Sequence, residues 1–448
     1  MGASWREKSV AAGLALVVTV SGLLAGCSSA AKTSGSGSAE GSHSAAKETV
    51  TIEYWHVNNQ DWGGNAIKEL VKKFNETHDG IQVVERYQPG NYAGLLQNAQ
   101  AAISAGTPPD VAQIGYNFIT YVHENVPYTP IEQIASKDEK DPGFIEKNFQ
   151  PHILKLGQTA DGRLAGLPYA LSNPVLYYNA DLLRKAGWDP DKPPKTWEEV
   201  RTLSRQIKEK TGKFGLYIQE PPDNWAQYAL VRSNGGDWMK EENGEKKVTV
   251  DSPEVIEVYD MMGQMAKEGL ALHTSWEEGM QAFINGQVGM MMTTIGRREH
   301  IESQSSFDLR ATVIPTFGDK PRAVTAGGNA LFVFAQDPVK QQAAWEFIKF
   351  LESPEALTVW VKATGYLPPV NGVAEDPNAL KPFFDSNPLM QAAVAQMDDI
   401  VPWFNFPGAN GLQAEQALLD ARDQVLSGSK TAEEALKEAA EKIRKLVN

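Results

Sequence analysis

The chain has 448 residues, 42% of them hydrophobic, and a formal net charge of −14. This acidic balance argues against partnership with nucleic acid or broad contact with an anionic membrane surface. The length exceeds what one hydrophobic core organises, so we expect two lobes, and a single cysteine, Cys27, excludes an internal disulfide framework.

The first 26 residues have the order of a secretory signal peptide. Arg6 and Lys8 come first, an apolar stretch follows over 10–24, and two small residues end it. A bilayer-spanning helix needs about 20 apolar residues, so this stretch is too short. Cys27 directly after it resembles the lipobox of bacterial lipoproteins. The resemblance implies cleavage before Cys27, a diacylglycerol on its thiol (palmitate among the acyl chains) and a lipid anchor at the extracytoplasmic face of the cell membrane. The alternative is a plain signal peptide followed by an incidental cysteine.

The next stretch, 27–47, consists largely of serine, glycine and alanine. Such a segment buries too little apolar surface to offset the entropy of ordering, so we interpret it as a flexible tether. Its length suits a surface protein of the Gram-positive type. Folding is expected to begin at Glu48.

From Glu48 onward, strands and helices alternate. The first part is predicted to hold strands at 50–55, 81–87 and 110–114, with helices at 64–75 and 92–105 between them. This rhythm favours an α/β fold with a largely parallel sheet and helices on both faces. Downstream we predict extended segments at 164–169 and 175–178, strands at 288–293, 309–314 and 330–334, and helices at 197–210, 252–268, 276–285, 339–351, 354–364, 412–426 and 431–446.

Short motifs follow one another through this part of the chain in a characteristic order. They are Tyr54-Trp55-His56, Phe74-Asn75, Gly90-Asn91-Tyr92, Ala105-Gly106-Thr107-Pro108-Pro109-Asp110-Val111, Pro174-Val175-Leu176-Tyr177-Tyr178-Asn179, Pro193-Pro194-Lys195-Thr196-Trp197, Ala282-Phe283-Ile284-Asn285-Gly286, Gly327-Gly328-Asn329-Ala330-Leu331 and Thr364-Gly365-Tyr366-Leu367-Pro368. No motif is specific alone. Their joint order resembles the extracellular solute-binding proteins of carbohydrate-type ABC importers, the maltodextrin-binding-like superfamily, and most of all its glycerol-3-phosphate-binding branch.

The resemblance implies an α/β fold of the two-lobe periplasmic-binding-protein type, with a hinge and a ligand cleft between the lobes. Lobe 1 is expected over 48–166 and 311–356, and lobe 2 over 167–310 and 357–448. A ligand that contacts both lobes favours the closed state by its differential affinity. The closed receptor would deliver its ligand to the transmembrane subunits of a permease. It is expected to be a monomer without cofactor or metal.

Sugars present C–H faces and rings of hydroxyls, so their sites need flat aromatic surfaces and many hydrogen-bonding groups. Candidate contacts are taken from the positions where the family places its ligand. They are Trp55, Asn58, Asn59, Asp61, Tyr92, Gln113, Tyr116, Tyr169, Ser172, Asn173, Trp225, Gly296, Arg297, Gly327, Gly328, Asn329, Tyr366, Trp403, Phe404 and Asn405.

Several of these residues have a purely structural alternative. Trp55 is as compatible with a core position at a strand end, and Asp61 with a solvated loop. The pair Gly327-Gly328 fits a tight turn as well as close approach to a ligand. Trp403 and Phe404 stand in a loop bounded by proline and glycine, which favours a stacking platform. Four further tryptophans are predicted to pack in the core or under loops: Trp188, Trp197, Trp345 and Trp360.

The late loop departs from the glycerol-phosphate branch in one informative way. In that branch an arginine in this loop holds the phosphate, whereas 403–410 contains no basic residue here. A phosphate site without it loses a bidentate, charge-assisted contact. The departure favours a neutral carbohydrate, a disaccharide or short oligosaccharide. Arg297 and Arg298 near a helix start could still hold an anion, so glycerol-3-phosphate or a glycerophosphodiester is the alternative.

Sequence signatures of catalysis are missing. The seven histidines form no HExxH pattern, and neither a G-x-S-x-G elbow nor a P-loop occurs. We therefore expect a protein that is not an enzyme. An exported glycoside hydrolase is the competing class, because two facing carboxylates cannot be picked from 56 acidic residues by sequence alone.

Overall fold

The computed structural model describes residues 49–159, 161–220, 223–242 and 245–447. Chain contacts group Glu48–Asn448 as one unit, apart from Met1–Lys47. The predicted signal peptide, the tether and the acylation site Cys27 lie outside the described residues. Within the described ranges, no helix combines the length and the apolar character that crossing a membrane requires.

The first lobe is built on a five-stranded sheet in the order β2-β1-β3-β12-β4. Its strands are β1 Val50–His56, β2 Ile81–Tyr87, β3 Val111–Gly115, β4 Leu167–Ser172 and β12 Gly327–Val333. Helices α1 (Gly64–Thr77) and α2 (Asn91–Ser104) connect β1, β2 and β3, which pair in parallel. Strand β12 runs antiparallel to both β3 and β4, so four of the five strands point the same way and the sheet is largely parallel, as predicted, with one reversed strand.

The second lobe is built on a four-stranded sheet in the order β10-β5-β9-β6. Its strands are β5 Pro174–Asn179, β6 Phe214–Ile218, β9 Val288–Thr294 and β10 Leu309–Thr312. Strand β5 is antiparallel to both of its neighbours, and β6 is parallel to β9. Helices α7 (Ala180–Ala186), α8 (Trp197–Thr211) and α11 (Trp276–Ile284) pack against this sheet.

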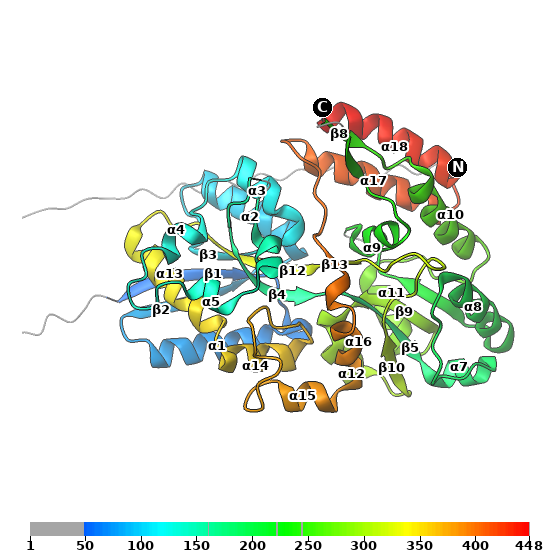
Figure 1. The fold of residues 1–448 in the computed structure, drawn as a ribbon, viewed down its shortest axis with the longest axis horizontal. Coiled ribbons are helices and arrows are strands. Elements are labelled where there is room, and N and C mark those ends of the chain that lie inside the picture. The colour runs from blue at the N-terminus through cyan, green and yellow to red at the C-terminus, as the bar shows by residue number, and fades with distance from the viewer. Residues whose placement is uncertain (1–48, 160, 221–222, 243–244, 448) are drawn as a thin grey trace, which may run out of the picture. The chain divides into compact units, whose positions relative to one another are not determined.

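Three long helices gather on the outer side of the second lobe. Helices α17 (Gly411–Leu426) and α18 (Ala432–Val447) form a hairpin that packs on α10 (Pro253–Lys267). Figure 1 shows the hairpin in orange and red at the C-terminal end of the colour scale. The last part of the chain therefore covers the second lobe, although the sheet of that lobe is complete by residue 312.

Short elements complete the two lobes. The helices are α3 Ile119–Asn125, α4 Ile131–Ala135, α5 Phe144–Asn148, α6 Pro151–Leu154, α9 Trp225–Ser233, α12 Arg298–Gln304, α13 Pro338–Leu351, α14 Pro354–Thr364, α15 Lys381–Ser386 and α16 Pro388–Val394. The 3-10 turns are η1 Gln60–Trp62, η2 Tyr116–Phe118, η3 Lys155–Gly157, η4 Ile295–Arg297 and η5 Met397–Asp399. Strands β7 (Met239–Glu242) and β8 (Glu245–Val248) form a hairpin, and β11 (Val324–Thr325) pairs with β13 (Ile400–Val401).

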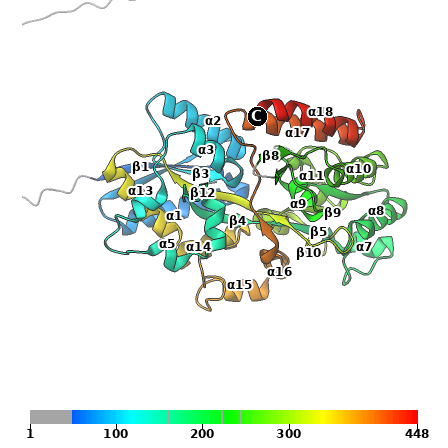
Figure 2. The same ribbon diagram turned by 45° about the horizontal axis from the view of Figure 1, so that its top comes forward.

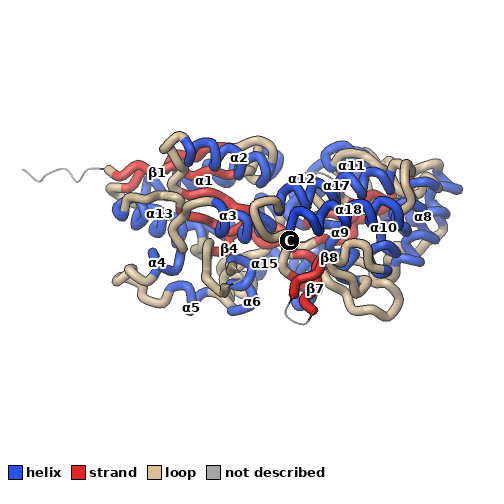
Figure 3. The backbone as a smooth tube through the Cα atoms, turned by 90° about the horizontal axis from the view of Figure 1, so that it is seen from above, coloured by secondary structure: helices blue, strands red, loops and turns tan. Residues whose placement is uncertain are grey.

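The chain passes between the lobes three times. It crosses at Asn173, between β4 and β5, returns between β10 and β12, and crosses again after α14. At two of these crossings the predicted lobe boundary differs from the observed one by a single strand or helix. Strand β4 pairs within the first sheet, and α14 packs on α1, although 167–172 and 357–364 were expected in lobe 2. Figures 2 and 3 show the two groups of elements side by side.

Local sequence signals explain where helices begin and end. Thr196 and Glu199 form a capping box at the start of α8, in which each side chain meets the other residue's backbone N–H. Pro253 opens α10, and Gly269 follows its end with φ +65°. Trp345 and Trp360 are fully buried, which confirms the prediction that they are core residues.

Candidate ligand-binding site

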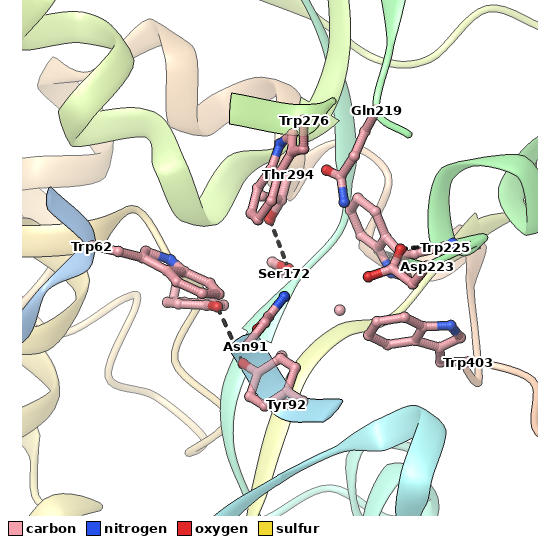
Figure 4. A pocket seen from close by; sticks show the side chains of 13 residues that line it. Trp62, Asn91, Tyr92, Ser172, Gln219, Asp223, Trp225, Trp276, Thr294 and Trp403 are labelled. Atoms are coloured by element: carbon pink, nitrogen blue, oxygen red, sulfur yellow. Dashed lines mark hydrogen bonds between the residues drawn. The ribbon is translucent and has the colours of Figure 1, made fainter. Parts of the chain in front are cut away.

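A cavity that is partly open to solvent, with about 300 Å³ of empty volume, lies between the two lobes (Figure 4). Its wall consists of aromatic residues, polar side chains and two glycines. The lining residues are Trp62, Asn91, Tyr92, Ser172, Gln219, Asp223, Trp225, Trp276, Thr294, Gly327, Gly328, Tyr366 and Trp403. They come from strand ends and helix starts of both lobes and from the late crossing segments. The cavity is thus in the position where a ligand would contact both lobes at once.

Seven of the predicted contacts meet at this cavity. They are Tyr92, Ser172, Trp225, Gly327, Gly328, Tyr366 and Trp403. Sequence reasoning missed six other lining residues: Trp62, Asn91, Gln219, Asp223, Trp276 and Thr294. Two of these, Asn91 and Asp223, stand directly beside motif residues that were chosen, so the motifs pointed to the right segments.

The aromatic wall is held by stacking and by its indole N–H groups. Trp62 stacks on Tyr366 with ring centroids 6.2 Å apart, and Trp276 meets Trp62 edge-on at 6.0 Å. Trp62 Nε1 donates to the carbonyl of Gly296 (3.0 Å) across the lobes. Across the cavity, Trp225 lies 6.2 Å from Trp403. The indole nitrogens of Trp62, Trp225 and Trp276 donate hydrogen bonds within the protein, so these three tryptophans have only their rings to offer a ligand.

The stack continues from the cavity into the core of the first lobe. Tyr366 stacks on Trp360 (5.5 Å) and Trp360 on Tyr169 (5.4 Å), with interplanar angles of 9° and 21°. Tyr169, a predicted contact, therefore supports the wall from behind. This column fixes the position of Tyr366 and Trp62 before any ligand arrives.

Polar groups stand between the aromatic surfaces. Thr294 donates to Ser172 Oγ at 3.0 Å, which joins the lobes at the cavity floor. The Tyr92 hydroxyl accepts from Asn329 Nδ2 (3.0 Å). Asn91 is the one non-glycine with a positive φ (58°) among the described residues, and its buried Oδ1 has no partner there. Such strain beside an unsatisfied amide is typical of ligand sites.

Neighbouring atoms leave no room for a side chain at Gly327 or Gly328. A Cβ on Gly327 would lie 2.5 Å from Ser172 Oγ and 2.8 Å from the Trp225 ring. Gly328 has φ +112°, and its Cβ would lie 1.9 Å from the carbonyl of Ala170. Both residues belong to β12 and not to a tight turn. They bring the backbone to the cavity wall.

Among the described residues that line the cavity, the only charged side chain is acidic. Asp223 is the wall's single carboxylate, and burial raises the pKa of this group to about 6. Among the described residues, no lysine, arginine or histidine lines the cavity. The same part of the chain holds no cluster of three or more histidine, cysteine or acidic side chains suited to a metal ion. The wall therefore offers no cation to a phosphate.

Arg297 was predicted as a contact and a possible anion ligand. In the structure its guanidinium contacts other side chains of the protein. Its guanidinium lies 4.7 Å from the Trp62 ring and 4.8 Å from the Trp276 ring, and it pairs with Glu277 at 2.9 Å. Only 3% of its surface is exposed. Arg298 pairs with Glu302 and donates to the carbonyl of Lys362 (2.7 Å). Neither arginine lines the cavity, because both are held by cation–π contacts and by ion pairs with acidic side chains.

The remaining predicted contacts lie behind or away from the wall. Trp55 donates to Glu53, Asn58 to the carbonyl of Trp62, and Asn59 and Asp61 are exposed. Gln113 donates to the Tyr54 hydroxyl, Tyr116 is buried behind the wall, and Asn173 donates to Ala393 O. Gly296 lies under Tyr366, Asn329 supports Tyr92, Phe404 packs on Trp238, and Asn405 donates to Tyr116 O. Three of them, Asn58, Gly296 and Asn329, contact lining residues of the cavity.

The fold and the site can be compared with known proteins. Residues 69–392 match the family of bacterial extracellular solute-binding proteins. The sn-glycerol-3-phosphate-binding periplasmic protein UgpB of Escherichia coli (strain K12) is 26% identical over 419 residues, which cover 90% of this chain and 93% of the relative.

Two solved structures share the fold. UgpB from Mycobacterium tuberculosis in complex with glycerophosphocholine has a TM-score of 0.79 at 18% identity, covering 89% of this chain and 98% of that one. Maltose-bound MalE3 of T. maritima has a TM-score of 0.77 at 23% identity, covering 89% and 100%. The family match spans most of the chain and the two-lobe fold agrees with it. The chain belongs to the bacterial extracellular solute-binding proteins.

Proposed function

We propose that the protein is the substrate-binding receptor of an ABC importer and captures a carbohydrate, a disaccharide or short oligosaccharide, in the cavity between its lobes. The observation that carries this proposal is the composition of the wall: four tryptophans and two tyrosines, with no cationic side chain among the described residues. Aromatic faces suit the C–H faces of sugars, and the amides and hydroxyls between them suit sugar hydroxyls.

Direct contacts between the lobes support a closed conformation around the cavity. Trp62 reaches Gly296, Thr294 reaches Ser172, and Arg297 approaches the carbonyl of Asp61 at 3.5 Å. A ligand held by both walls adds to these contacts and shifts the lobes toward closure. Closure would then present both lobes to the transmembrane subunits of the permease, with the receptor acting as a monomer.

Glycerol-3-phosphate is the second candidate because UgpB of Escherichia coli, named for that ligand, is similar over 90% of this chain. The cavity argues against it. A phosphate placed here would meet the carboxylate of Asp223 and no arginine, and an unpaired buried anion beside another is costly.

A glycoside hydrolase is disfavoured by the same wall. Such an enzyme needs two carboxylates on either side of the scissile bond, and Asp223 is the single one lining this cavity in the described residues. The relatives matched are binding proteins by name. A receptor without catalytic activity is therefore the better explanation.

The ligand class is tested by thermal stabilisation of the purified protein. The panel holds maltose-, trehalose-, arabinose- and xylose-type oligosaccharides beside glycerol-3-phosphate and glycerophosphocholine. A ligand at 100 times its Kd should add about 2.7 kcal/mol to the free energy of unfolding. Stabilisation by a carbohydrate is expected. Stabilisation by the phosphates alone would replace the carbohydrate with the second candidate, and slow hydrolysis of a bound oligosaccharide would argue for the enzyme.

We also propose that a signal peptide is removed and that a lipid on Cys27 anchors the protein at the extracytoplasmic face of the membrane. The order of charged, apolar and small residues before Cys27 supports this. Cys27→Ser should release the protein from membrane fractions, whereas the neighbouring Ser28→Ala should leave it there. Retention of Cys27→Ser in the membrane would contradict the anchor.

A further inference from the structure

The carboxylate of Asp223 has an unusual position on the cavity wall. It lies between β6 and α9, beside Trp225 and facing Trp403 (Figure 4). Its Oδ1 accepts a hydrogen bond from the backbone N–H of Trp225 at 3.0 Å, the single hydrogen bond that this carboxylate receives from the described residues. A partly buried carboxylate with one neutral donor is short of partners.

The nearby cation does not pair with this carboxylate. Arg422, 1% exposed, donates to the backbone carbonyl of Asp223 (2.7 Å) and to the side chain of Asn224 (3.4 Å). Its remaining nitrogens bind the carboxylate of Asp423 at 3.2 Å. The guanidinium therefore orders the segment that carries Asp223 but leaves the carboxylate itself to the cavity.

Two further carboxylates belong to the surroundings of the segment that carries Asp223, and neither supplies a positive charge to it. Glu415 on α17 accepts from Asn224 Nδ2 (3.0 Å), and burial raises the pKa of Glu415 to about 7. Glu220 at the end of β6 binds His273 at 2.7 Å, and burial raises the pKa of Glu220 to about 7. Four acidic residues stand here against two basic ones: Asp223, Glu220, Glu415 and Asp423 against Arg422 and His273. Neither of these basic residues lines the cavity.

The aromatic rings add to the same preference. Trp225 and Trp403 flank the carboxylate, and the faces of Trp276 and Tyr366 belong to the same wall. Ring faces carry the negative part of the aromatic quadrupole and attract a cation within about 6 Å. An ammonium group has three donors, enough for the carboxylate and for a neighbouring acceptor such as the Ser172 hydroxyl.

We propose that the ligand supplies this missing charge: the receptor takes an aminated carbohydrate, whose protonated amino group sits against Asp223 and between the rings of Trp225 and Trp403. This inference rests on the proposed function and narrows its ligand class. It makes Asp223 the residue that determines specificity between an amino sugar and its hydroxyl counterpart.

The test uses disaccharides that share one skeleton. The β-1,4-linked glucosamine dimer, its N-acetylated form and cellobiose carry an ammonium, an amide and a hydroxyl at the same carbon, and trehalose with 2-amino-trehalose gives an α-linked pair. Calorimetry at pH 7 should show the amine binding at least about tenfold more tightly than its hydroxyl counterpart in at least one series. The preference should shrink at pH 5, because Asp223 takes up a proton with a pKa of about 6.

Asp223→Asn should remove the preference at pH 7, so that the amine and its hydroxyl counterpart bind this variant with affinities within about twofold of each other. Asp61→Asn, the same change on an exposed loop, is the matched control and should leave the preference intact. The pH comparison on the unsubstituted protein gives a result even where Asp223→Asn does not fold.

Each outcome separates the inference from the function on which it rests. Binding of neutral sugars with no gain from an amine, or a preference that survives Asp223→Asn, would overturn the inference and keep the carbohydrate receptor. Stabilisation by glycerophosphocholine or glycerol-3-phosphate, with no carbohydrate bound, would overturn both.

Discussion

Asp223 lines the aromatic cavity, whereas Arg297 lies behind the rings of Trp62 and Trp276, and the protein treats the two charges differently. Arg297 lies against two indoles and pairs with Glu277, so its charge has a partner within the chain, although its buried Nε has none there. Asp223 receives one backbone hydrogen bond from the described residues and faces the cavity. A satisfied charge serves the architecture, whereas an unsatisfied one beside a cavity points to a ligand.

The largest effect is expected from removing the Arg297 side chain. Arg297→Ala removes contacts with both Trp62 and Trp276 and leaves a gap between the lobes, so the free energy of unfolding should fall by about 3 kcal/mol. Denaturant titration measures this. Arg184→Ala breaks ion pairs with Asp181 and Asp308 at an exposed site and should change the midpoint little. Equal effects of both substitutions would mean that the aromatic contacts of Arg297 contribute nothing.

Removing the charge of Asp223 should have the opposite sign. The pKa of Asp223 rises from 3.8 to about 6 on folding, so the ionised form is penalised in the folded protein and stability falls as the pH rises between these values. Asp223→Asn should therefore stabilise the ligand-free protein by about 1–2 kcal/mol at pH 8. The gain should vanish near pH 4. A thermal melt series from pH 4 to 8 measures it, and a constant offset across the series would contradict the assigned titration.

The smallest effect concerns the ring that flanks Asp223. Trp403→Ala should weaken carbohydrate binding by more than about 1 kcal/mol, which is the worth of one stacked aromatic contact. Trp188→Ala is a suitable control, since this half-buried indole donates to Lys192 O at 2.8 Å and lies away from the cavity. Unchanged affinity of Trp403→Ala in calorimetry would remove Trp403 from the site.

Much of the fold follows from local sequence signals, and the limits have physical reasons. The helix predicted over 197–210 starts at Trp197, directly after Thr196, which forms a capping box with Glu199. The direction of β12 was not predicted, because a short apolar run is the same for parallel and antiparallel pairing. Strand β4 was assigned to the wrong side of the crossing for a similar reason, since 164–169 and 175–178 look alike as extended segments.

The site was predictable only where one segment carries its own signal. Gly327, Tyr366 and Trp403 were found because the family resemblance places ligand contacts at these positions, and all three line the cavity. Trp62 and Trp276 were missed because they reach the cavity through contacts between residues far apart in the chain. Arg297 was placed in the site from its position in the family, and the two indoles that it contacts could not be read from its neighbours in sequence.

The Trp62 ring lines the cavity and, through Nε1, holds the carbonyl of Gly296 on the other lobe. The same side chain would thus contact the ligand and form a hydrogen bond between the lobes, so the two are coupled. A compound bulky enough to hold this ring away from Gly296 would occupy the protein without allowing full closure. Such a compound would bind the receptor and compete with the ligand, but it would not be delivered to the permease. Tight binding would then not lead to uptake. The space beneath the Trp62 ring would set the upper size of a transported ligand.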